Sequence, residues 1–238
     1  MKFNGKTLSV AAEFTGGGGG DSYYDEFWDE VQENGNRTKY DFGFCHSTWS
    51  DAIFKPKYNM QPTSASYMFT QSKITDLQAA LDRAGVTLDF SLVPSASMTR
   101  LFDSSSITRI GVVNLTGAGL INTFFANATE LQTIEELVLS EANTFGTKMF
   151  ENCAKLANVT ISGTIADTLD MSVCPLTPDS MKSVILHLKD LSDSGEANTK
   201  TIKFSDICWD ELATDSISPV EDMSWKAYVT DYLSWKTE

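Results

Sequence analysis

The sequence predicts an α/β fold in which similar short units stack into an irregular solenoid with a helical cap at each end. The first observation is a recurring motif, an apolar pair that ends in Phe and is followed five or six positions later by an aliphatic residue. The second is the spacing, because Phe102, Phe125 and Phe150 stand 23 and 25 positions apart. A unit of this length cannot bury its own apolar face, so the units must stack on one another.

Four units carry the motif, and the last three also share a second aliphatic residue and a β-rich run. The motifs are Tyr67-Met68-Phe69 with Ile74, Leu101-Phe102 with Ile107, Phe124-Phe125 with Leu131, and Met149-Phe150 with Leu156. The second aliphatic residues are Ile110, Ile134 and Val159, and the predicted strands cover 112–115, 137–139 and 159–161. The third position after the Phe is small in these three units (Ser105, Ala128 and Cys153), which indicates a tight interior site. We therefore expect their Phe side chains to lie one above another inside a shared hydrophobic spine.

Residues 1–20 are predicted to form an N-terminal arm and a tether. The segment 6–14 alternates as a short strand does, and 16–20 is a run of five glycines, which behaves as a flexible link. Residues 21–66 are predicted to form a cap that combines a helix with an aromatic-rich irregular segment. The apolar stripe of this helix consists of Tyr24, Phe27, Trp28 and Val31.

Residues 67–165 form the predicted repeat body, and residues 166–238 form the C-terminal cap. In the first unit of the body, Thr75 to Gln78 matches a capping box for an inserted helix, and 86–90 alternates as a strand. The C-terminal cap is predicted to contain two helices and a strand between them. These elements are a helix over 178–191 that opens at Thr177-Pro178, a strand over 200–204, and a last helix that opens at Ser218.

The composition argues against two classes of partner. The 238 residues include 18 Lys and Arg against 32 Asp and Glu, which gives a formal net charge of −14. A nucleic-acid backbone or an anionic membrane attracts clustered positive charge, so we expect neither as a partner. The chain has no run of 18 apolar residues, and its first residues lack the continuous apolar stretch of a secretory signal. We therefore expect a soluble protein that is made in the cytoplasm and does not insert into a membrane.

The residues predict no catalytic, cofactor-binding or metal-binding site, and they identify no ligand-binding residue. The four cysteines form no C-x-x-C pair, and Cys45-His46 has no second ligand pair at a matching spacing. A G-x-S-x-G nucleophile elbow is missing from the sequence. The acidic pairs keep a carbohydrate-active hydrolase open as an alternative, because glycoside hydrolysis needs two carboxylates across a cleft. One such pair, Glu135 and Glu136, is predicted to lie in the turn before a strand.

Several segments of the chain resemble a known family. The run 149–161 (MFENCAKLANVTI) resembles the repeat of BspA-type leucine-rich-repeat proteins, in which a Phe, an Asn-Cys turn, a Leu and a strand follow one another. The segment 174–185 is similar to the terminal module found with such repeats in phage and prophage proteins of gut bacteria. The segments 24–29, 34–38 and 54–58 also resemble these proteins, so that the resemblance covers most of residues 21–191. It implies a leucine-rich-repeat-like body and a phage or surface-recognition role, and it implies no catalytic residue.

We therefore expect a non-enzymatic component of a phage virion, associated with the tail, baseplate, fibre or capsid. Residues 1–15 and the glycine tether would dock the protein to other virion proteins, where several copies would assemble as a homo-oligomer. The repeat body would present a face for assembly or for recognition of a host-surface protein or glycan. A bacterial cell-surface adhesin with the same body is the first alternative, and the hydrolase is the second.

Overall fold

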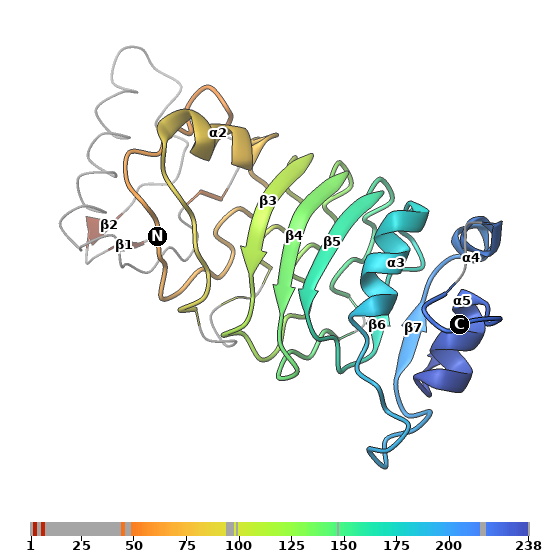
Figure 1. Ribbon diagram of the computed structural model, residues 1–238. Coiled ribbons are helices and arrows are strands. Elements are labelled where there is room, and N and C mark those ends of the chain that lie inside the picture. Colours follow the sequence, from red (N-terminus) through yellow and green to blue (C-terminus); the bar gives the residue numbers. More distant parts are fainter. Residues whose placement is uncertain are drawn as a thin grey trace.

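The computed structural model describes residues 2–3, 6–7, 44–45, 49–93, 98, 100–146, 148–214 and 218–237. Within these residues the fold is α/β, with two parallel three-stranded sheets, four α-helices and a short antiparallel pair (Figure 1). The helices are α2 (Leu77–Ala84), α3 (Pro178–Leu186), α4 (Asp206–Thr214) and α5 (Trp225–Ala227), which continues into the π-helical turn η3 (Tyr228–Tyr232). The strands are β1 (Lys2–Phe3), β2 (Lys6–Thr7), β3 (Arg109–Asn114), β4 (Thr133–Leu139), β5 (Asn158–Gly163), β6 (Leu169–Asp170), β7 (Thr201–Lys203) and β8 (Lys236–Thr237).

The central sheet has the order β3-β4-β5, and each strand comes from one of the three regular units. Ile110 of β3 pairs with Ile134 of β4, and Ile134 pairs with Val159 of β5, so equivalent residues of successive units are neighbours. All three side chains are buried against the same core. The predicted strands are confirmed with different ends. All three begin before the predicted first residue, β3 ends at Asn114 rather than at 115, and β5 continues past the predicted end to Gly163.

On the opposite side of the core, four short segments that we call the Phe turns also stack on one another. They cover 67–72, 100–105, 123–128 and 148–153. Backbone hydrogen bonds join each Phe turn to the next, from Phe69 N to Leu101 O (2.9 Å), from Phe102 N to Phe124 O (2.9 Å), and from Phe125 N to Met149 O (3.0 Å). Each unit therefore pairs with its neighbour on both sides of the core, through a strand on one side and a Phe turn on the other.

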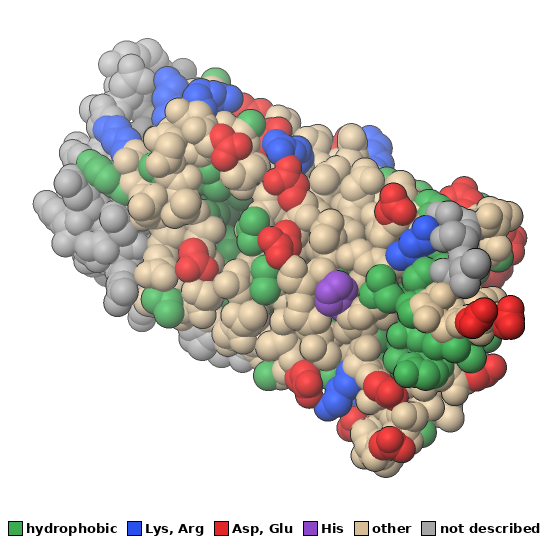
Figure 2. All heavy atoms as spheres, viewed as in Figure 1, with side chains coloured by type: hydrophobic (Ala, Val, Ile, Leu, Met, Phe, Trp, Pro, Cys, Tyr) green, Lys and Arg blue, Asp and Glu red, His purple; other side chains and the backbone are tan. Residues whose placement is uncertain are grey.

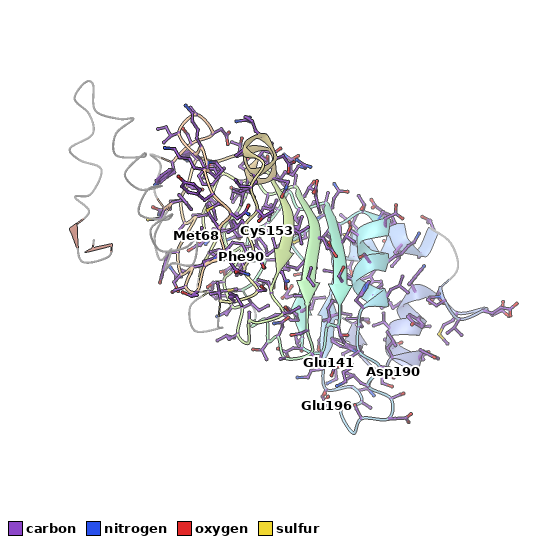
Figure 3. All side chains as sticks on the ribbon, turned by 60° about the vertical axis from the view of Figure 1, so that its left-hand side comes forward. Met68, Phe90, Glu141, Cys153, Asp190 and Glu196 are labelled. Atoms are coloured by element: carbon purple, nitrogen blue, oxygen red, sulfur yellow. The ribbon has the colours of Figure 1, made fainter. Side chains whose placement is uncertain are left out.

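The predicted spine of aromatic rings is confirmed. The ring of Phe102 lies 5.3 Å from that of Phe69 and 5.5 Å from that of Phe125, and Phe125 lies 5.4 Å from Phe150. The interplanar angles are 8°, 5° and 7°, so the four rings are nearly parallel, and each is at most 1% exposed. Figure 3 shows Cys153 in the interior of the same body, together with Met68 and Phe90.

Helices flank both edges of the central sheet. At the β5 edge, the hydroxyls of Ser180 and Ser183 in α3 accept hydrogen bonds from the backbone N–H groups of Val159 (2.9 Å) and Ile161 (2.8 Å). Figure 1 shows α3 beside β5, in the place that a further strand would take. At the β3 edge, α2 approaches so closely that a Cβ atom on Gly111 would lie 1.8 Å from Gln78 Oε1. An unpaired strand edge is a site for uncontrolled pairing, and the two helices cover both edges.

The C-terminal region adds a second parallel sheet with the order β6-β7-β8. Its core includes Trp235, which is fully buried and whose ring N–H donates to the carbonyl of Lys189 (2.7 Å). The helices α4 and α5 lie at the C-terminal end of the molecule (Figure 1). One hydrophobic core runs from Phe44 to Trp235, so the C-terminal region continues the core of the stacked body.

Two expectations on the N-terminal side need correction. The inserted helix has Asp76 as its N-cap, with Asp76 Oδ1 accepting from Ala79 N (2.8 Å), and the capping box from Thr75 is not formed. The strand predicted over 86–90 is reduced to a single parallel bridge between Leu88 and Met60, because Asp89 turns the chain by accepting the N–H of Ser91. Of the strand predicted over 6–14, β2 covers the first two residues, and the remainder, the glycine tether and the helix predicted after it lie outside the described residues.

The C-terminal cap differs from the prediction in three ways. The helix α3 starts at Pro178 as predicted but ends at Leu186, because the next residues bridge back to Ile165 with hydrogen bonds of 2.7 and 2.8 Å. The last helix starts at Trp225 after the cap Ser224, and Ser218 instead caps a local turn by accepting from Val220 N (3.3 Å). The helix α4 was not predicted. The predicted strand over 200–204 is confirmed as β7.

None of the described helices is both long enough and apolar enough to span a membrane.

Candidate functional site

The outward surface of the central sheet, which we call the outer face, is formed by three paired parallel strands. Between the buried side chains of each strand, partly or fully exposed residues project outward. They are Arg109, Val112 and Asn114 of β3, Thr133, Glu135, Glu136 and Val138 of β4, and Asn158, Thr160 and Ser162 of β5. The paired strands hold these side chains at the fixed spacing of a parallel sheet, about 4.8 Å between neighbouring strands.

A β-bulge interrupts the regular pairing of β4 with β5. Ile134 pairs with Val159 and Leu137 pairs with Ile161, so two residues of β4 lie opposite the single Thr160 of β5. A bulge of this kind redirects side chains and is common beside binding sites. Here it turns both Glu135 and Glu136 toward the outside, which corrects the expectation that the pair lies in a turn before the strand.

A pocket of about 300 Å³ lies beside this bulge, between β4, β5 and the first turn of α3. Seven of its nine lining residues have polar side chains. The lining residues are Thr133, Ile134, Glu135, Asn158, Val159, Thr160, Thr177, Asp179 and Ser180. Ile134 and Val159 belong to the buried core, so the side chains that a bound molecule would meet are hydroxyls, an amide and two carboxylates.

Three side chains of the pocket keep their hydrogen-bonding capacity free. Within the described part of the chain, no protein group bonds to the hydroxyls of Thr133 and Thr160 or to the side-chain amide of Asn158. Asn158 and Thr160 are exposed, and Thr133, which is directly opposite Asn158 in the sheet, is partly exposed. The hydroxyl of Ser180 is buried and is used to hold β5 in place. The pocket therefore combines a fixed floor with free polar groups at its surface.

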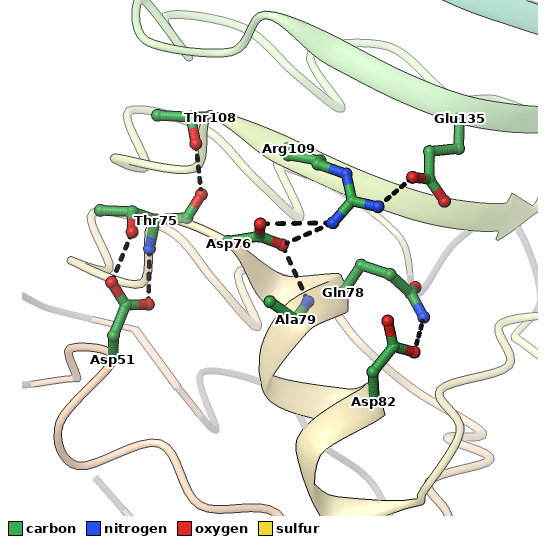
Figure 4. A network of polar contacts seen from close by, with 9 residues as sticks. All are labelled: Asp51, Thr75, Asp76, Gln78, Ala79, Asp82, Thr108, Arg109 and Glu135. Atoms are coloured by element: carbon green, nitrogen blue, oxygen red, sulfur yellow. Dashed lines mark hydrogen bonds and ion pairs between the residues drawn. The ribbon is translucent and has the colours of Figure 1, made fainter.

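A network of polar contacts fixes the upper edge of the outer face (Figure 4). Arg109 of β3 donates to both oxygens of Asp76 (3.3 and 3.4 Å) and also to Glu135 of β4. The hydrogen bond to Glu135 is the main reason that the pKa of Arg109 is raised, with Asp76 adding to the effect. One guanidinium thus links the N-cap of α2 to two strands and orients the carboxylate of Glu135 at the pocket.

The surface beyond the outer face differs in character. Figure 2 views the outer face and shows hydrophobic side chains gathered over α5 and η3 at the C-terminal end. Within that region Tyr228 stacks on Tyr232 at 5.2 Å, and Tyr232 is 48% exposed. Figure 3 shows Glu141 and Glu196 near Asp190 at the lower edge of the molecule, where Lys189 bonds to Glu141 (2.8 Å).

The structure places the reactive residue types of the sequence inside the fold. Cys45, Cys153, Cys174 and Cys208 are all buried and unpaired. Burial raises the pKa of the Cys45 thiol to about 11 and that of Cys153 to about 12, and it also raises the pKa of Cys174. His46, the other half of the Cys45-His46 pair, lies outside the described residues, and the described residues contain no group of three or more potential metal ligands.

Sequence reasoning did not find the pocket, although a signal was present. The strand β4 reads TIEELVL, in which outward and buried residues alternate except at the doubled Glu135-Glu136. A break of this kind in the period of two indicates a bulge inside a strand. The contribution of α3 had no such signal, because Ser180 and Thr177 are distant from β4 in the sequence.

Comparisons of the chain with protein-family models, with curated proteins and with solved structures found no match.

Proposed function

We propose that this protein is a non-enzymatic binding component of a phage particle, and that its outer face recognises a partner on the particle or on the host surface. The observation that carries the proposal is the outer face itself, a rigid parallel sheet with a polar pocket and free hydrogen-bonding groups. Because paired strands fix these groups before any ligand arrives, binding costs little ordering of the protein.

We also propose that the body is a short, irregular solenoid of the leucine-rich-repeat type. Three observations support this reading. Equivalent residues of successive units are neighbours in the sheet, the Phe turns hydrogen-bond in series, and the Phe rings stack at nearly constant distances of 5.3 to 5.5 Å. Solenoids usually present an extended surface for binding, which agrees with the proposed role.

Binding without turnover fits the pocket better than hydrolysis does. A glycosidase keeps one carboxyl protonated, usually by burying it away from water, and sets the second across the scissile bond. Of the two carboxylates in this pocket, Glu135 is paired with Arg109, and the side chain of Asp179 is 95% exposed and lies 3.7 Å from Lys182. Neither carboxylate has the desolvated environment that a general acid needs.

The presence of the protein in the particle is tested by purifying phage particles from a lysate of the bacteria that produce them. We expect mass spectrometry to find the chain in the purified particles in a fixed ratio to the other virion proteins. We further expect a variant that lacks residues 1–20 to fold, with an unchanged thermal transition, and to be missing from the particles.

Two results would contradict the proposal. If purified particles contain none of the protein, it is not a virion component, and recovery of the protein on bacterial cells instead would favour the adhesin alternative. If the truncated variant is incorporated normally, residues 1–20 are not the attachment segment.

A further inference from the structure

We infer that the pocket beside the bulge binds one uncharged sugar unit of a surface glycan. This inference rests on the proposed function, because it names the class of partner that the outer face recognises. It depends on the free polar groups of the pocket, on its charge and on its size.

The free groups of the pocket match the chemistry of a sugar. A pyranose presents neighbouring hydroxyls, each of which both donates and accepts a hydrogen bond. Thr133 and Thr160 offer hydroxyls with the same dual capacity, and the amide of Asn158 offers two donors and an acceptor. Thr133 and Asn158 are paired neighbours on adjacent strands, and Thr160 follows Asn158 on the same face of β5. The three groups therefore converge from two rigid strands on one small volume.

The same lining disfavours a peptide or an apolar ligand. Hot spots of protein partners are rich in Trp, Tyr and Arg that fill desolvated apolar pockets. The two apolar residues in the lining, Ile134 and Val159, are at most 3% exposed and offer no such surface. A ligand that buried mainly carbon would leave the hydroxyls of Thr133 and Thr160 without partners, and each unpaired group would cost about 1–3 kcal/mol.

The charges around the pocket select against an anionic sugar. Arg109 is shared between Asp76 and Glu135, so one positive charge faces two negative charges. The first turn of α3 would attract an anion, but Asp179 occupies that turn and the side chain of Thr177 already accepts the N–H of Ser180. Lys182 lies 3.7 Å from Asp179, so two positive charges stand against three negative charges around the pocket. The remaining negative charge would repel a uronic acid, a sulfated sugar or a phosphorylated sugar, whereas it would not repel an uncharged sugar.

The size of the pocket and the lack of an exposed aromatic or aliphatic side chain in its lining predict weak binding at a single site. A pocket of about 300 Å³ is at the lower end of the range for small-molecule sites, which agrees with one sugar unit. Without an apolar anchor, we expect a dissociation constant on the order of 1 mM for a monosaccharide. Many copies on one particle would raise the avidity by about 10²–10⁴ without a new contact.

The test uses the full chain, captured on a biosensor, and soluble polyacrylamide polymers that display one type of monosaccharide. The neutral polymers carry glucose, galactose, mannose, rhamnose or N-acetylglucosamine, and the charged polymer carries glucuronic acid at the same density. We expect at least one neutral polymer to bind and the glucuronic acid polymer to bind at least about tenfold more weakly.

A pair of matched variants connects the binding to the pocket. Thr160→Val keeps the branched shape of the side chain and removes the free hydroxyl, and we expect it to weaken binding by about tenfold. Thr164→Val is the same change just beyond β5, at a residue that does not line the pocket, and it should leave binding unchanged within about twofold. Circular dichroism melting of both variants establishes that they fold.

The inference is wrong if no neutral polymer binds, if the glucuronic acid polymer binds equally well, or if the two variants behave alike. Phage that carry Thr160→Val separate this inference from the proposed function. If such particles contain the protein in normal amounts and still adsorb to cells at the normal rate, the sugar inference fails while the virion role stands. If wild-type particles lack the protein but a neutral polymer binds through Thr160, the sugar site stands and the virion role fails.

Discussion

In the stacked body the four Phe rings of the spine lie face to face, whereas in the C-terminal region the buried pair Phe204 and Trp209 meets edge to face. Phe102 and Phe125 are 5.5 Å apart with planes 5° from parallel, while Phe204 and Trp209 are 5.1 Å apart with planes inclined by 67°. The first arrangement follows from repetition, because identical residues at equivalent positions of stacked units must lie above one another. The second arrangement closes the core with residues that do not recur.

The backbone of the body repeats in the same way as its rings do, whereas the left-handed non-glycine residues of the C-terminal region (Asn198, Asp222 and Ser234) stand singly. Three of the Phe turns use left-handed residues on both sides of the Phe, for example Thr123 (φ +61°) and Asn127 (φ +58°) around Phe125, and the turn of Phe150 has one, Asn152 (φ +63°). These non-glycine residues cost about 1–2 kcal/mol each in this conformation, and interactions between units must offset that cost. One such interaction is a side-chain ladder, in which Asn152 donates to Asn127 (2.8 Å) and Asn127 donates to Asp103 (3.0 Å). The comparison teaches that stability in the body comes from contact between units, while the C-terminal region relies on individual buried contacts.

The largest expected effect comes from removing one ring of the spine. Phe125→Ala leaves a cavity between Phe102 and Phe150, and we expect it to lower the free energy of unfolding by about 3–5 kcal/mol. Phe204→Ala is the matched change in the C-terminal region, where Phe204 packs against the single ring of Trp209, and it should cost less. Urea denaturation of both variants measures the difference. An unchanged transition for Phe125→Ala would end the comparison, because the spine would then contribute nothing to stability.

Two glycines with left-handed backbones provide a second test. A Cβ atom on Gly163 (φ +85°) would lie 2.0 Å from the carbonyl oxygen of Leu139 in the neighbouring strand, whereas a Cβ atom on Gly195 (φ +73°) would meet nothing within 4 Å. We expect Gly163→Ala to destabilise the protein by about 3 kcal/mol and Gly195→Ala by about 1 kcal/mol. Thermal melting compares the two. Equal effects would mean that strand-to-strand packing at Leu139 is looser than the backbone indicates.

The buried thiols predict a loss of stability at alkaline pH. In the folded protein the pKa of Cys45 is raised from 9.0 to about 11 and that of Cys153 from 9.0 to about 12, mainly by burial. The thiols of the unfolded chain ionise at lower pH than those of the folded protein. Their contribution to the free energy of unfolding is therefore fully present below pH 9, and it declines as the pH rises toward the pKa values of the folded protein. The decline is at most about 1.4 kcal/mol per pH unit for each thiol.

Cys153→Ala assigns part of this decline to the stacked body. Alanine already occupies the equivalent position in the preceding unit as Ala128, so the substitution fits the available space. We expect the variant to lose stability less steeply between pH 9 and 11 than the wild type does, as followed by urea denaturation at each pH. Parallel curves for the two proteins would show that Cys153 is not protected in the folded state.

A smaller effect is expected at the edge of the central sheet. Ser180→Ala leaves the buried N–H of Val159 without its acceptor, and we expect a loss of about 1–3 kcal/mol. Ser172→Ala removes an exposed hydroxyl that bonds to Asp170 in a local turn, and it should change stability by no more than about 0.5 kcal/mol. Hydrogen exchange of the Val159 amide adds a local measurement. If that amide stays protected in Ser180→Ala, the hydroxyl is not what covers the edge.

Where local and long-range signals agreed, the sequence was a good guide to the fold. The spacing of Phe102, Phe125 and Phe150 predicted their stacking because a repeated side chain at a repeated position has only one way to pack in a stack. Thr177-Pro178 predicted the start of α3 because capping is a local interaction between residues three positions apart. The predicted start of the last helix failed at Ser218, where the left-handed Asp222 (φ +62°) separates that turn from Trp225.

The sequence by itself therefore determined the repeated apolar spine, the strands that accompany it and the cap of α3. The spine and the strands follow from residue types that recur from unit to unit, and the cap is a local interaction. Only the tertiary structure decided the pocket. It requires the bulge at Glu135 and Glu136, which appears when β4 is paired with β5, and it requires α3 to lie against the edge of that sheet. Both are contacts between units, and residue order within a unit carries no information on which neighbour will meet a given side chain.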